Sequence, residues 1–233
     1  MSANAVLSGY NVLHISLENN ESQILRNYDV RILGHTLDEL KDNVEGSIEA
    51  MNIIHEQVKG DLRVKKYPTK TATVSTIRNL VDQLILVDDW HPDVITVDYG
   101  AILSSEHDYK DKRSGIEEVY ESLRALADEY DVALYTAAQG NRSSLAKKVV
   151  TTMDLAECFA IANIADICVA LCQDGREKAQ GIMRGFVAKN RDNSDGMILT
   201  GTINYNIKRL DFTDEVSDAE QYNIDDSSDD DWE

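Results

Sequence analysis

The sequence predicts an α/β protein: a mainly parallel sheet flanked by helices, with antiparallel strands towards the carboxyl end. Two observations carry this prediction. Near-continuous apolar runs, which strands covered on both faces require, alternate with amphipathic stretches of helical period. Two late strands then flank a polar turn over residues 189–196, as expected for an antiparallel hairpin.

The expected strands share a short apolar core that ends next to polar or turn residues. The first ends at Leu17, before Glu18, the third ends on Asp98, and the fourth ends before Gln139. In chain order, the expected strands cover residues 11–17, 62–67, 92–98, 131–138, 167–172, 182–188 and 197–206.

Helices are expected where apolar residues recur at three- and four-residue intervals. Thr36-Leu-Asp-Glu39 is a capping box that opens a helix running to about Lys59, and Gly60 ends it. Asn20 and Thr73 are further candidate N-caps. The expected helices cover residues 36–59, 73–87, 116–126 and 153–164, with another after Asn20.

The net charge of −19 is unevenly distributed along the 233 residues. Residues 211–233 hold eleven acids and no Lys or Arg, so we expect a folded domain over 1–210 and an acidic, disordered tail over 211–233. The tail could compete with DNA for basic loops, dock on a partner through Trp232, or only aid solubility. No secretory signal and no apolar run of membrane-spanning length is seen, which predicts a cytoplasmic protein.

The three cysteines, Cys158, Cys168 and Cys172, are expected to be small buried apolar residues. Cys168 and Cys172 would share one face of a strand. The sequence has no CxxC pair and no Cys/His cluster at metal spacing, so a structural zinc site is not expected.

Polar residues at the carboxyl ends of parallel strands are the first candidates for a functional site, because ligands of open α/β sheets bind there. Glu18, Asp98 and Gln139 meet this condition. A carboxylate that follows a rigid apolar strand suits an enzyme that holds Mg²⁺ and a nucleotide. Each signal alone is weak, and each residue could instead belong to an ordinary strand-end turn.

Five ordered blocks resemble the motor domain of DnaB-type, especially phage, replicative DNA helicases within the RecA-like ATPases. Gly9 to Glu18 resembles the segment whose glutamate orients the attacking water, and Asp93 to Gly100 resembles the Walker B strand. Thr136 to Arg142 resembles the segment whose glutamine, here Gln139, senses the γ-phosphate. Asp154-Leu-Ala-Glu followed by Ala165-Asp166 resembles the next block, and Val187 to Gly196 resembles the one that carries the lysine and arginine finger.

The resemblance implies ATP and Mg²⁺ as cofactors, with Asp98 binding the metal through water. It makes Glu18, Gln139, Lys189 and Arg191 catalytic, with Arg191 reaching a neighbouring subunit's nucleotide in a homo-hexamer. It also implies movement on single-stranded DNA in the 5′-to-3′ direction, and a primase or loader as a partner. Lys189 and Arg191 could otherwise be residues of a solvated turn.

Two basic loops follow strands on the expected active edge. In a ring they could hold the phosphates of single-stranded DNA, although ordinary solvated loops have the same composition. The candidate DNA-binding residues are Lys110, Lys112, Arg113, Arg142, Lys147 and Lys148.

The sequence departs from the family in having no GxxxxGK[ST] phosphate-binding loop, since none of its twelve glycines precedes lysine. Residues 2–10 resemble the end of the helix that follows that loop, so the central Walker A strand is expected to be missing. Its loss should expose apolar sheet edges. The loop could come from a separate polypeptide, be lost by truncation, or be absent from a non-catalytic remnant, and the isolated chain is expected to be inactive.

Two other functions stay open beside the helicase motor. A RecA-like recombinase ATPase would share the same strand-end residues, but the Lys-Asn-Arg turn favours the helicase. A degenerate ATPase fold acting as a scaffold or regulator would explain the missing loop, but not the intact Glu18, Asp98, Gln139 and Arg191.

Overall fold

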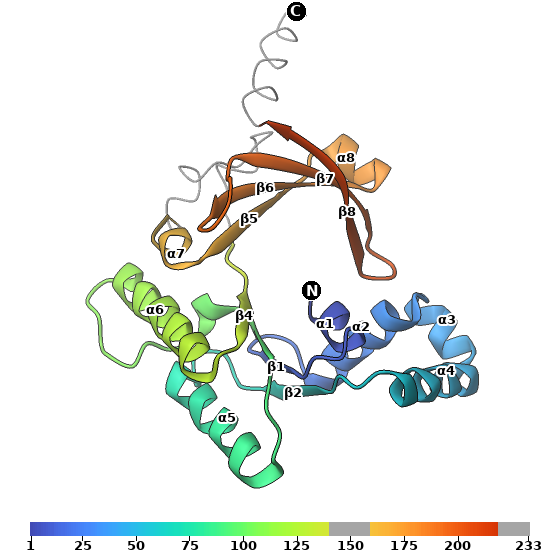
Figure 1. Cartoon of the computed structure of the whole chain (residues 1–233), viewed down its shortest axis with the longest axis horizontal. Helices are drawn as coiled ribbons and strands as arrows, with labels where there is room; N and C mark the ends of the chain where they lie inside the picture. Colours follow the sequence, from blue (N-terminus) through green and yellow to red (C-terminus); the bar gives the residue numbers. More distant parts are fainter. Residues whose placement is uncertain (140–158, 219–233) are drawn as a thin grey trace, which may run out of the picture. The chain divides into compact units, whose positions relative to one another are not determined.

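The structure is a computed structural model that describes residues 1–139 and 159–218. The chain divides into two compact units, the first from Met1 to Ala138 and the second beginning at Gln139, and each is described by itself. Figure 1 follows the chain through both units. No helix in these two ranges is long and apolar enough to cross a bilayer.

The first unit alternates helices and strands, as the sequence predicts. Its strands are β1 (Val12–Ser16), β2 (Leu62–Lys66), β3 (Val94–Asp98) and β4 (Ala133–Thr136). Its helices are α1 (Ser2–Leu7), α2 (Glu21–Leu33), α3 (Leu37–Asp42), α4 (Val44–Gln57), α5 (Val74–Asp88) and α6 (Lys112–Tyr130), with a short 3₁₀ turn, η1 (Gly100–Ile102), after β3.

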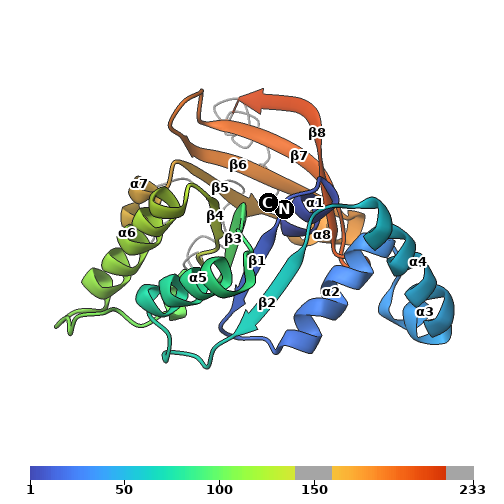
Figure 2. The same ribbon diagram turned by 60° about the horizontal axis from the view of Figure 1, so that its bottom comes forward.

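The four strands form one parallel sheet in the order β2-β1-β3-β4. Figure 2 shows α1 and α2 over one face of this sheet and α5 and α6 over the other. Because both faces are covered, the central strands are mainly apolar. Leu13, Ile15 and Ile95 are at most 1% exposed.

The middle of the parallel sheet is closed, although the family resemblance implies that a central strand is missing there. β3 pairs directly with β4, in a register that sets Val94 opposite Ala133 and Val97 opposite Thr136. No gap is therefore left between β3 and β4, and the sheet ends at β2 and β4. Pairing satisfies the backbone N–H and C=O groups that a gap would leave without partners.

The long helix expected over residues 36–59 is broken in two at Asn43. The capping box forms as predicted, because Thr36 accepts from Glu39 N and Glu39 reaches back to Thr36 N at 2.7 Å. Asn43 then ends α3 in a non-helical conformation and caps α4, its Oδ1 accepting from Gly46 N at 3.2 Å. An asparagine side chain that binds the backbone locally competes with helix continuation.

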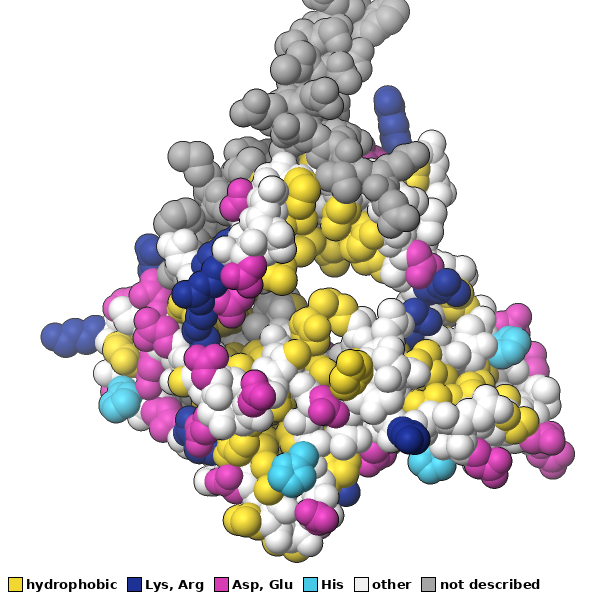
Figure 3. Space-filling view, viewed as in Figure 1, with side chains coloured by type: hydrophobic (Ala, Val, Ile, Leu, Met, Phe, Trp, Pro, Cys, Tyr) yellow, Lys and Arg dark blue, Asp and Glu magenta, His cyan; other side chains and the backbone are white. Residues whose placement is uncertain are grey.

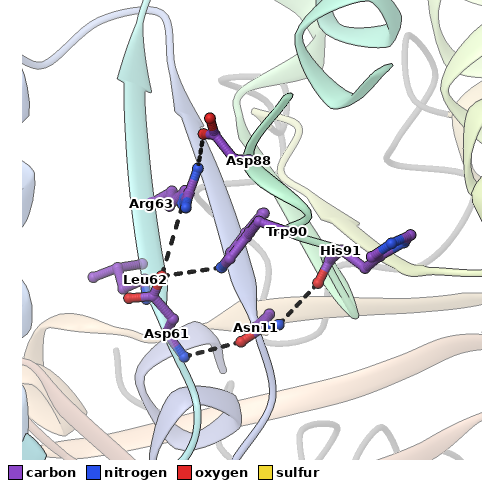
Figure 4. Close-up of polar contacts among 7 residues, drawn as sticks. All are labelled: Asn11, Asp61, Leu62, Arg63, Asp88, Trp90 and His91. Atoms are coloured by element: carbon purple, nitrogen blue, oxygen red, sulfur yellow. Dashed lines mark hydrogen bonds and ion pairs between the residues drawn. The ribbon is translucent and has the colours of Figure 1, made fainter. Parts of the chain in front are cut away.

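A polar network closes the amino-terminal end of the sheet (Figure 4). Trp90 Nε1 donates to Asp61 at 3.0 Å, and Arg63 lies over the Trp90 ring at 4.7 Å while it pairs with Asp88. Asp61 N donates to Asn11 Oδ1 at 3.2 Å. These groups are committed to structural contacts, so they leave the opposite end of the sheet as the place for chemistry.

His14 is a polar residue within β1, on the face covered by α2. Its Nδ1 lies 2.9 Å from Tyr28 Oη, and its Nε2 is buried with no hydrogen-bond partner in the described ranges. Burial lowers the pKa of His14, while the negative charge of Asp98 opposes that effect. His14 is therefore held as a neutral imidazole.

We expect the lowered pKa of His14 to make the first unit less stable in acid. An unfolded chain binds a proton at the ordinary histidine pKa, near 6.5, when the folded chain does not. The stabilisation is thus complete above that pH and is lost as the pH falls through it, by at most about 1.4 kcal/mol per pH unit. Urea unfolding of His14→Gln between pH 7.5 and 5.5 should show a shallower pH dependence. The exposed His55→Gln control should keep the wild-type slope, and equal slopes for all three proteins would contradict the prediction.

The second unit is built on an antiparallel sheet in the order β5-β6-β7-β8. Its strands are β5 (Ile167–Cys172), β6 (Ile182–Asn190), β7 (Met197–Asn204) and β8 (Arg209–Asp218), and its helices are α7 (Phe159–Ile164) and α8 (Gly175–Gln180). The predicted late strands are thus confirmed. Cys172 is buried and Cys168 half-buried, whereas Cys158 lies outside the described residues.

β8 was not predicted, because the acidic composition from Asp211 onwards indicated disorder. The expectation is wrong for residues 211–218, which pair with β7. The Phe212 ring lies against two glycines, and an added Cβ at Gly185 or Gly201 would approach it to 2.8 Å. Ladder hydrogen bonds and this aromatic contact offset the cost of ordering an acidic strand. Residues 219–233 lie outside the described residues.

Candidate functional site

Glu18 and Asp98 lie at the carboxyl ends of two adjacent parallel strands, as predicted. β1 and β3 pair in a register that sets Ser16 opposite Asp98, and Leu17 N donates to Asp98 O at 3.0 Å. Glu18 is exposed and Asp98 half-buried. Two carboxylates supported by rigid strands therefore lie at the same edge of the sheet, with one of them open to solvent.

The turn that carries Glu18 is fixed by residues that the sequence patterns did not single out. Ser16 is fully buried; its Oγ donates to Asn19 O at 2.9 Å and accepts from Asn19 N at 3.1 Å. Thr69 Oγ1 donates to Leu17 O at 2.9 Å. Glu18 is thus held between two anchored neighbours, which limits the directions its side chain can take.

The loop after Asp98 is tied to β4 through Thr136. The Thr136 hydroxyl donates to Val97 O at 3.0 Å and accepts from Gly100 N at 2.9 Å, so it bridges the two sides of Asp98. A Cβ at Gly100 would lie 3.2 Å from Thr136 Oγ1, which favours glycine at this close approach. Nothing in the spacing of the sequence indicated that Thr136 supports the site.

Gln139 follows β4 by three residues and is exposed. Because β4 is parallel to β3, its carboxyl end points to the same edge of the sheet as Asp98. Gln139 itself is the first residue of the second unit. Its meeting with Glu18 and Asp98 therefore stays a prediction.

Lys189 and Arg191 lie near the carboxyl end of β6, in the second unit. β6 extends to Asn190, so Lys189 belongs to the strand and not to the turn expected there, and Arg191 is the first residue after it. Lys189 Nζ donates to Asn163 O at 2.6 Å, and Arg191 Nη1 donates to Asp166 Oδ1 at 2.8 Å. Lys189 is therefore bound to α7, and Arg191 to the segment that joins α7 to β5.

Three of the six candidate DNA-binding residues lie in the described part of the chain. Lys110 is exposed just before α6, whereas Lys112 and Arg113 belong to the first turn of α6 and not to the loop expected there. Arg113 is paired with Glu117 at 3.0 Å. Figure 3 shows acidic side chains spread over the α6 region and over the α3–α4 pair. Arg142, Lys147 and Lys148 lie outside the described residues.

The oxygen donors at the strand ends suit a magnesium–nucleotide pair. Among the described residues, no three His, Cys, Asp or Glu side chains come together as a metal cluster. Mg²⁺ commonly keeps several waters and takes one or two carboxylates together with substrate phosphates. A site with Asp98 and few other protein ligands therefore fits this ion. The role of Asp98 in binding the ion through water stays a prediction.

Comparisons with solved structures support the fold. A structure described as a DnaB-like replicative helicase and its interactions with primase superimposes with a TM-score of 0.74 over 90% of this chain and 53% of that chain, at 16% identity. A second solved structure, described as an ATPase domain, gives a TM-score of 0.75 over 90% of this chain and 76% of that chain, also at 16% identity. The RecA-like α/β architecture with late antiparallel strands is therefore confirmed.

Sequence comparisons identify the family. The DnaB-like replicative helicase of Enterobacteria phage T4 is 31% identical over 186 residues, which cover 74% of this chain and 38% of that protein. The present chain thus spans well under half the length of this relative. The family model for the DnaB-like helicase C-terminal domain matches residues 1–214. The chain belongs to the DnaB-like helicase C-terminal domain family.

Proposed function

We propose that this chain is part of an ATP-driven replicative DNA helicase motor that couples ATP hydrolysis to movement on single-stranded DNA. The observation that carries the proposal is that Glu18 and Asp98 stand at the ends of adjacent strands, which are joined by the 3.0 Å bond from Leu17 N to Asp98 O. Hydrolysis of a nucleotide needs a positioned water and a positioned metal, and two carboxylates on neighbouring strand ends can serve both. Family membership agrees with this activity.

Each candidate residue has a distinct role in this proposal. Glu18 orients the water that attacks the γ-phosphate, and Asp98 holds the waters of Mg²⁺. Gln139 contacts the γ-phosphate, while Lys189 and Arg191 act on the nucleotide of the neighbouring subunit. Mg²⁺, when bound, neutralises charge that develops on the phosphate oxygens, and the protein contributes positioning and electrostatics.

The phosphate-binding loop must be supplied by another segment, because these 233 residues contain no GxxxxGK[ST]. That segment could belong to a longer form of the same protein or to a separate polypeptide. Backbone N–H groups of such a loop normally supply most of the contacts to the phosphates. Hydrolysis by the residues of this chain therefore depends on a loop-bearing segment.

Single-stranded DNA and other replication proteins are the proposed partners. Lys110, Lys112, Arg113, Arg142, Lys147 and Lys148 would bind DNA phosphates, in a mode that salt weakens. The proposed role of Arg191 requires a neighbouring subunit, and the family resemblance leads us to propose a homo-hexamer. The solved relative described with primase supports a primase or a loader as a further partner.

The proposal is tested on the chain joined to, or mixed with, a segment that contains GxxxxGK[ST]. Glu18→Gln removes the charge that orients water but keeps the size of the side chain. We expect kcat for ATP hydrolysis to fall at least about a hundredfold, with Mg-ATP affinity changed less than about threefold. Glu49→Gln, an exposed change on α4, is the matched control and should keep wild-type kcat.

The outcomes also separate the other functions. A loop-bearing assembly that hydrolyses ATP but cannot separate DNA strands would indicate a recombinase-type ATPase. One that binds partners but neither binds nor hydrolyses ATP would indicate a scaffold. Equal kcat for Glu18→Gln and wild type would overturn the assignment of Glu18.

A further inference from the structure

Three hydrogen bonds hold the Lys-Asn-Arg sequence at the end of β6, one from α7 and two from Asp166, which precedes β5. Lys189 Nζ donates to Asn163 O at 2.6 Å, and Arg191 N donates to Asp166 O at 2.9 Å. Arg191 Nη1 donates to Asp166 Oδ1 at 2.8 Å. Asp166 thus contacts Arg191 twice, once through its backbone and once through its carboxylate.

We infer that Asp166 is a positioning residue for Arg191, holding its guanidinium ready to meet the nucleotide of a neighbouring subunit. The inference rests on the proposed role of Arg191 as a finger that acts across a subunit boundary. It adds a residue of the same subunit that does not touch the nucleotide.

An arginine whose guanidinium must reach a phosphate on another subunit needs a contact that orients its long side chain. The side chain has many rotamers, and an unsupported guanidinium would reach the phosphate only in a fraction of them. A charge-assisted hydrogen bond to a carboxylate selects among those rotamers, because it is directional as well as attractive. Asp166 is well placed for this purpose, since its backbone is fixed by the start of β5 and by the bond to Arg191 N.

The exposure of the pair suits a positioning contact better than a structural one. The side chains of Arg191 and Asp166 are 58% and 53% exposed. Half-exposed ion pairs contribute little to stability, so selection of a side-chain conformation is a more fitting purpose. By contrast, Arg184 in the same unit is 3% exposed in its pair with Glu177, as expected for a structural ion pair.

The backbone bond allows the two purposes to be separated. Asp166→Ala removes the carboxylate but keeps the carbonyl that accepts from Arg191 N, so the junction of β5 and β6 stays anchored. The change therefore tests the orientation of the Arg191 guanidinium, and not the pairing of β5 with β6. Asp166→Asn keeps an oxygen at the same position without the charge.

The matched control is Asp211 on β8, which pairs with Arg209. Their side chains are 47% and 53% exposed, close to those of Asp166 and Arg191. Asp211→Ala removes an equally exposed carboxylate from an arginine in the same sheet. Any general effect of lost surface charge should appear in this variant too.

The experiment measures ATP hydrolysis in the loop-bearing assembly. We expect Asp166→Ala to lower kcat about tenfold while KM for ATP stays within about twofold, because the nucleotide is bound mainly by the other subunit. Asp166→Asn should fall between Ala and wild type, and Asp211→Ala should match wild type. In NMR spectra of the chain alone, the Nη–H signals of Arg191 should exchange several-fold faster with solvent in Asp166→Ala than in Asp211→Ala, because Nη1 donates to Asp166.

The outcomes distinguish this inference from the proposed function. If Arg191→Ala abolishes hydrolysis but Asp166→Ala keeps wild-type kcat, the inference about Asp166 is overturned. The proposed role of Arg191 is then still supported. If Arg191→Ala leaves hydrolysis unchanged, the finger and its positioning residue are overturned together. A change confined to KM, or one shared by Asp211→Ala, would also count against Asp166 as a positioning residue.

Discussion

Replacing Arg191 with alanine should lower ATP hydrolysis in a loop-bearing assembly by about a thousandfold or more, while nucleotide binding stays nearly intact. An arginine that stabilises charge on the transferring phosphoryl group acts mainly in the transition state, so its loss reduces kcat rather than affinity. Titration of Mg-ATP binding alongside steady-state hydrolysis measures both quantities. A parallel loss of binding would show that Arg191 maintains the structure of the site.

Mixing two inactive variants tests whether Arg191 acts across a subunit boundary. In a mixed ring, an Arg191→Ala subunit keeps Glu18, and a Glu18→Ala neighbour can supply Arg191. Roughly a quarter of the interfaces in an equal mixture should then contain both groups, which should restore part of the activity. No recovery at any ratio would leave Arg191 as a residue of the turn after β6.

The second large effect concerns the stability of the second unit. Arg184 is 3% exposed, and its Nε and Nη2 lie 2.6 and 3.0 Å from the carboxylate oxygens of Glu177. Glu177 also completes the capping box of α8, accepting from Asp174 N at 2.7 Å. Glu177→Ala removes this carboxylate from a buried cation, so we expect a loss of about 3–5 kcal/mol in the free energy of unfolding.

Urea unfolding of the second unit measures this loss, and two variants make the result specific. Asp211→Ala breaks the exposed pair with Arg209 in the same unit and should cost no more than about 1 kcal/mol. Combining Glu177→Ala with Arg184→Met should recover much of the stability, because the buried charge is then gone. A loss below about 1 kcal/mol for Glu177→Ala alone would show that Arg184 does not depend on this carboxylate.

The strand ends were predictable from sequence because their signals are local. An apolar run that ends on a carboxylate identifies both a buried strand and its carboxyl end, so Glu18 and Asp98 could be placed at one edge of the sheet from the sequence alone. The capping box at Thr36 was predictable for the same reason. Its contacts join residues three apart in the sequence.

The remaining features depend on contacts between distant residues, or on competition between two local preferences. Asn43 favours both a helix end and a helix start, and helical periodicity does not reveal that choice. β8 is acidic, and its order depends on pairing with β7 and on the Phe212 contact with Gly185 and Gly201. Asp166 meets Arg191 because β5 and β6 pair, which no spacing in the sequence indicates.

The bridge made by Thr136 also makes the opening of the sheet cooperative. Separating β4 from β3 breaks not only ladder bonds but also the two hydroxyl bonds at Val97 and Gly100, and both are lost in one displacement. Gly100 N is partly buried there, so it would need a new acceptor at once. A strand inserted between β3 and β4 would therefore break this bridge and leave Gly100 N in need of another acceptor.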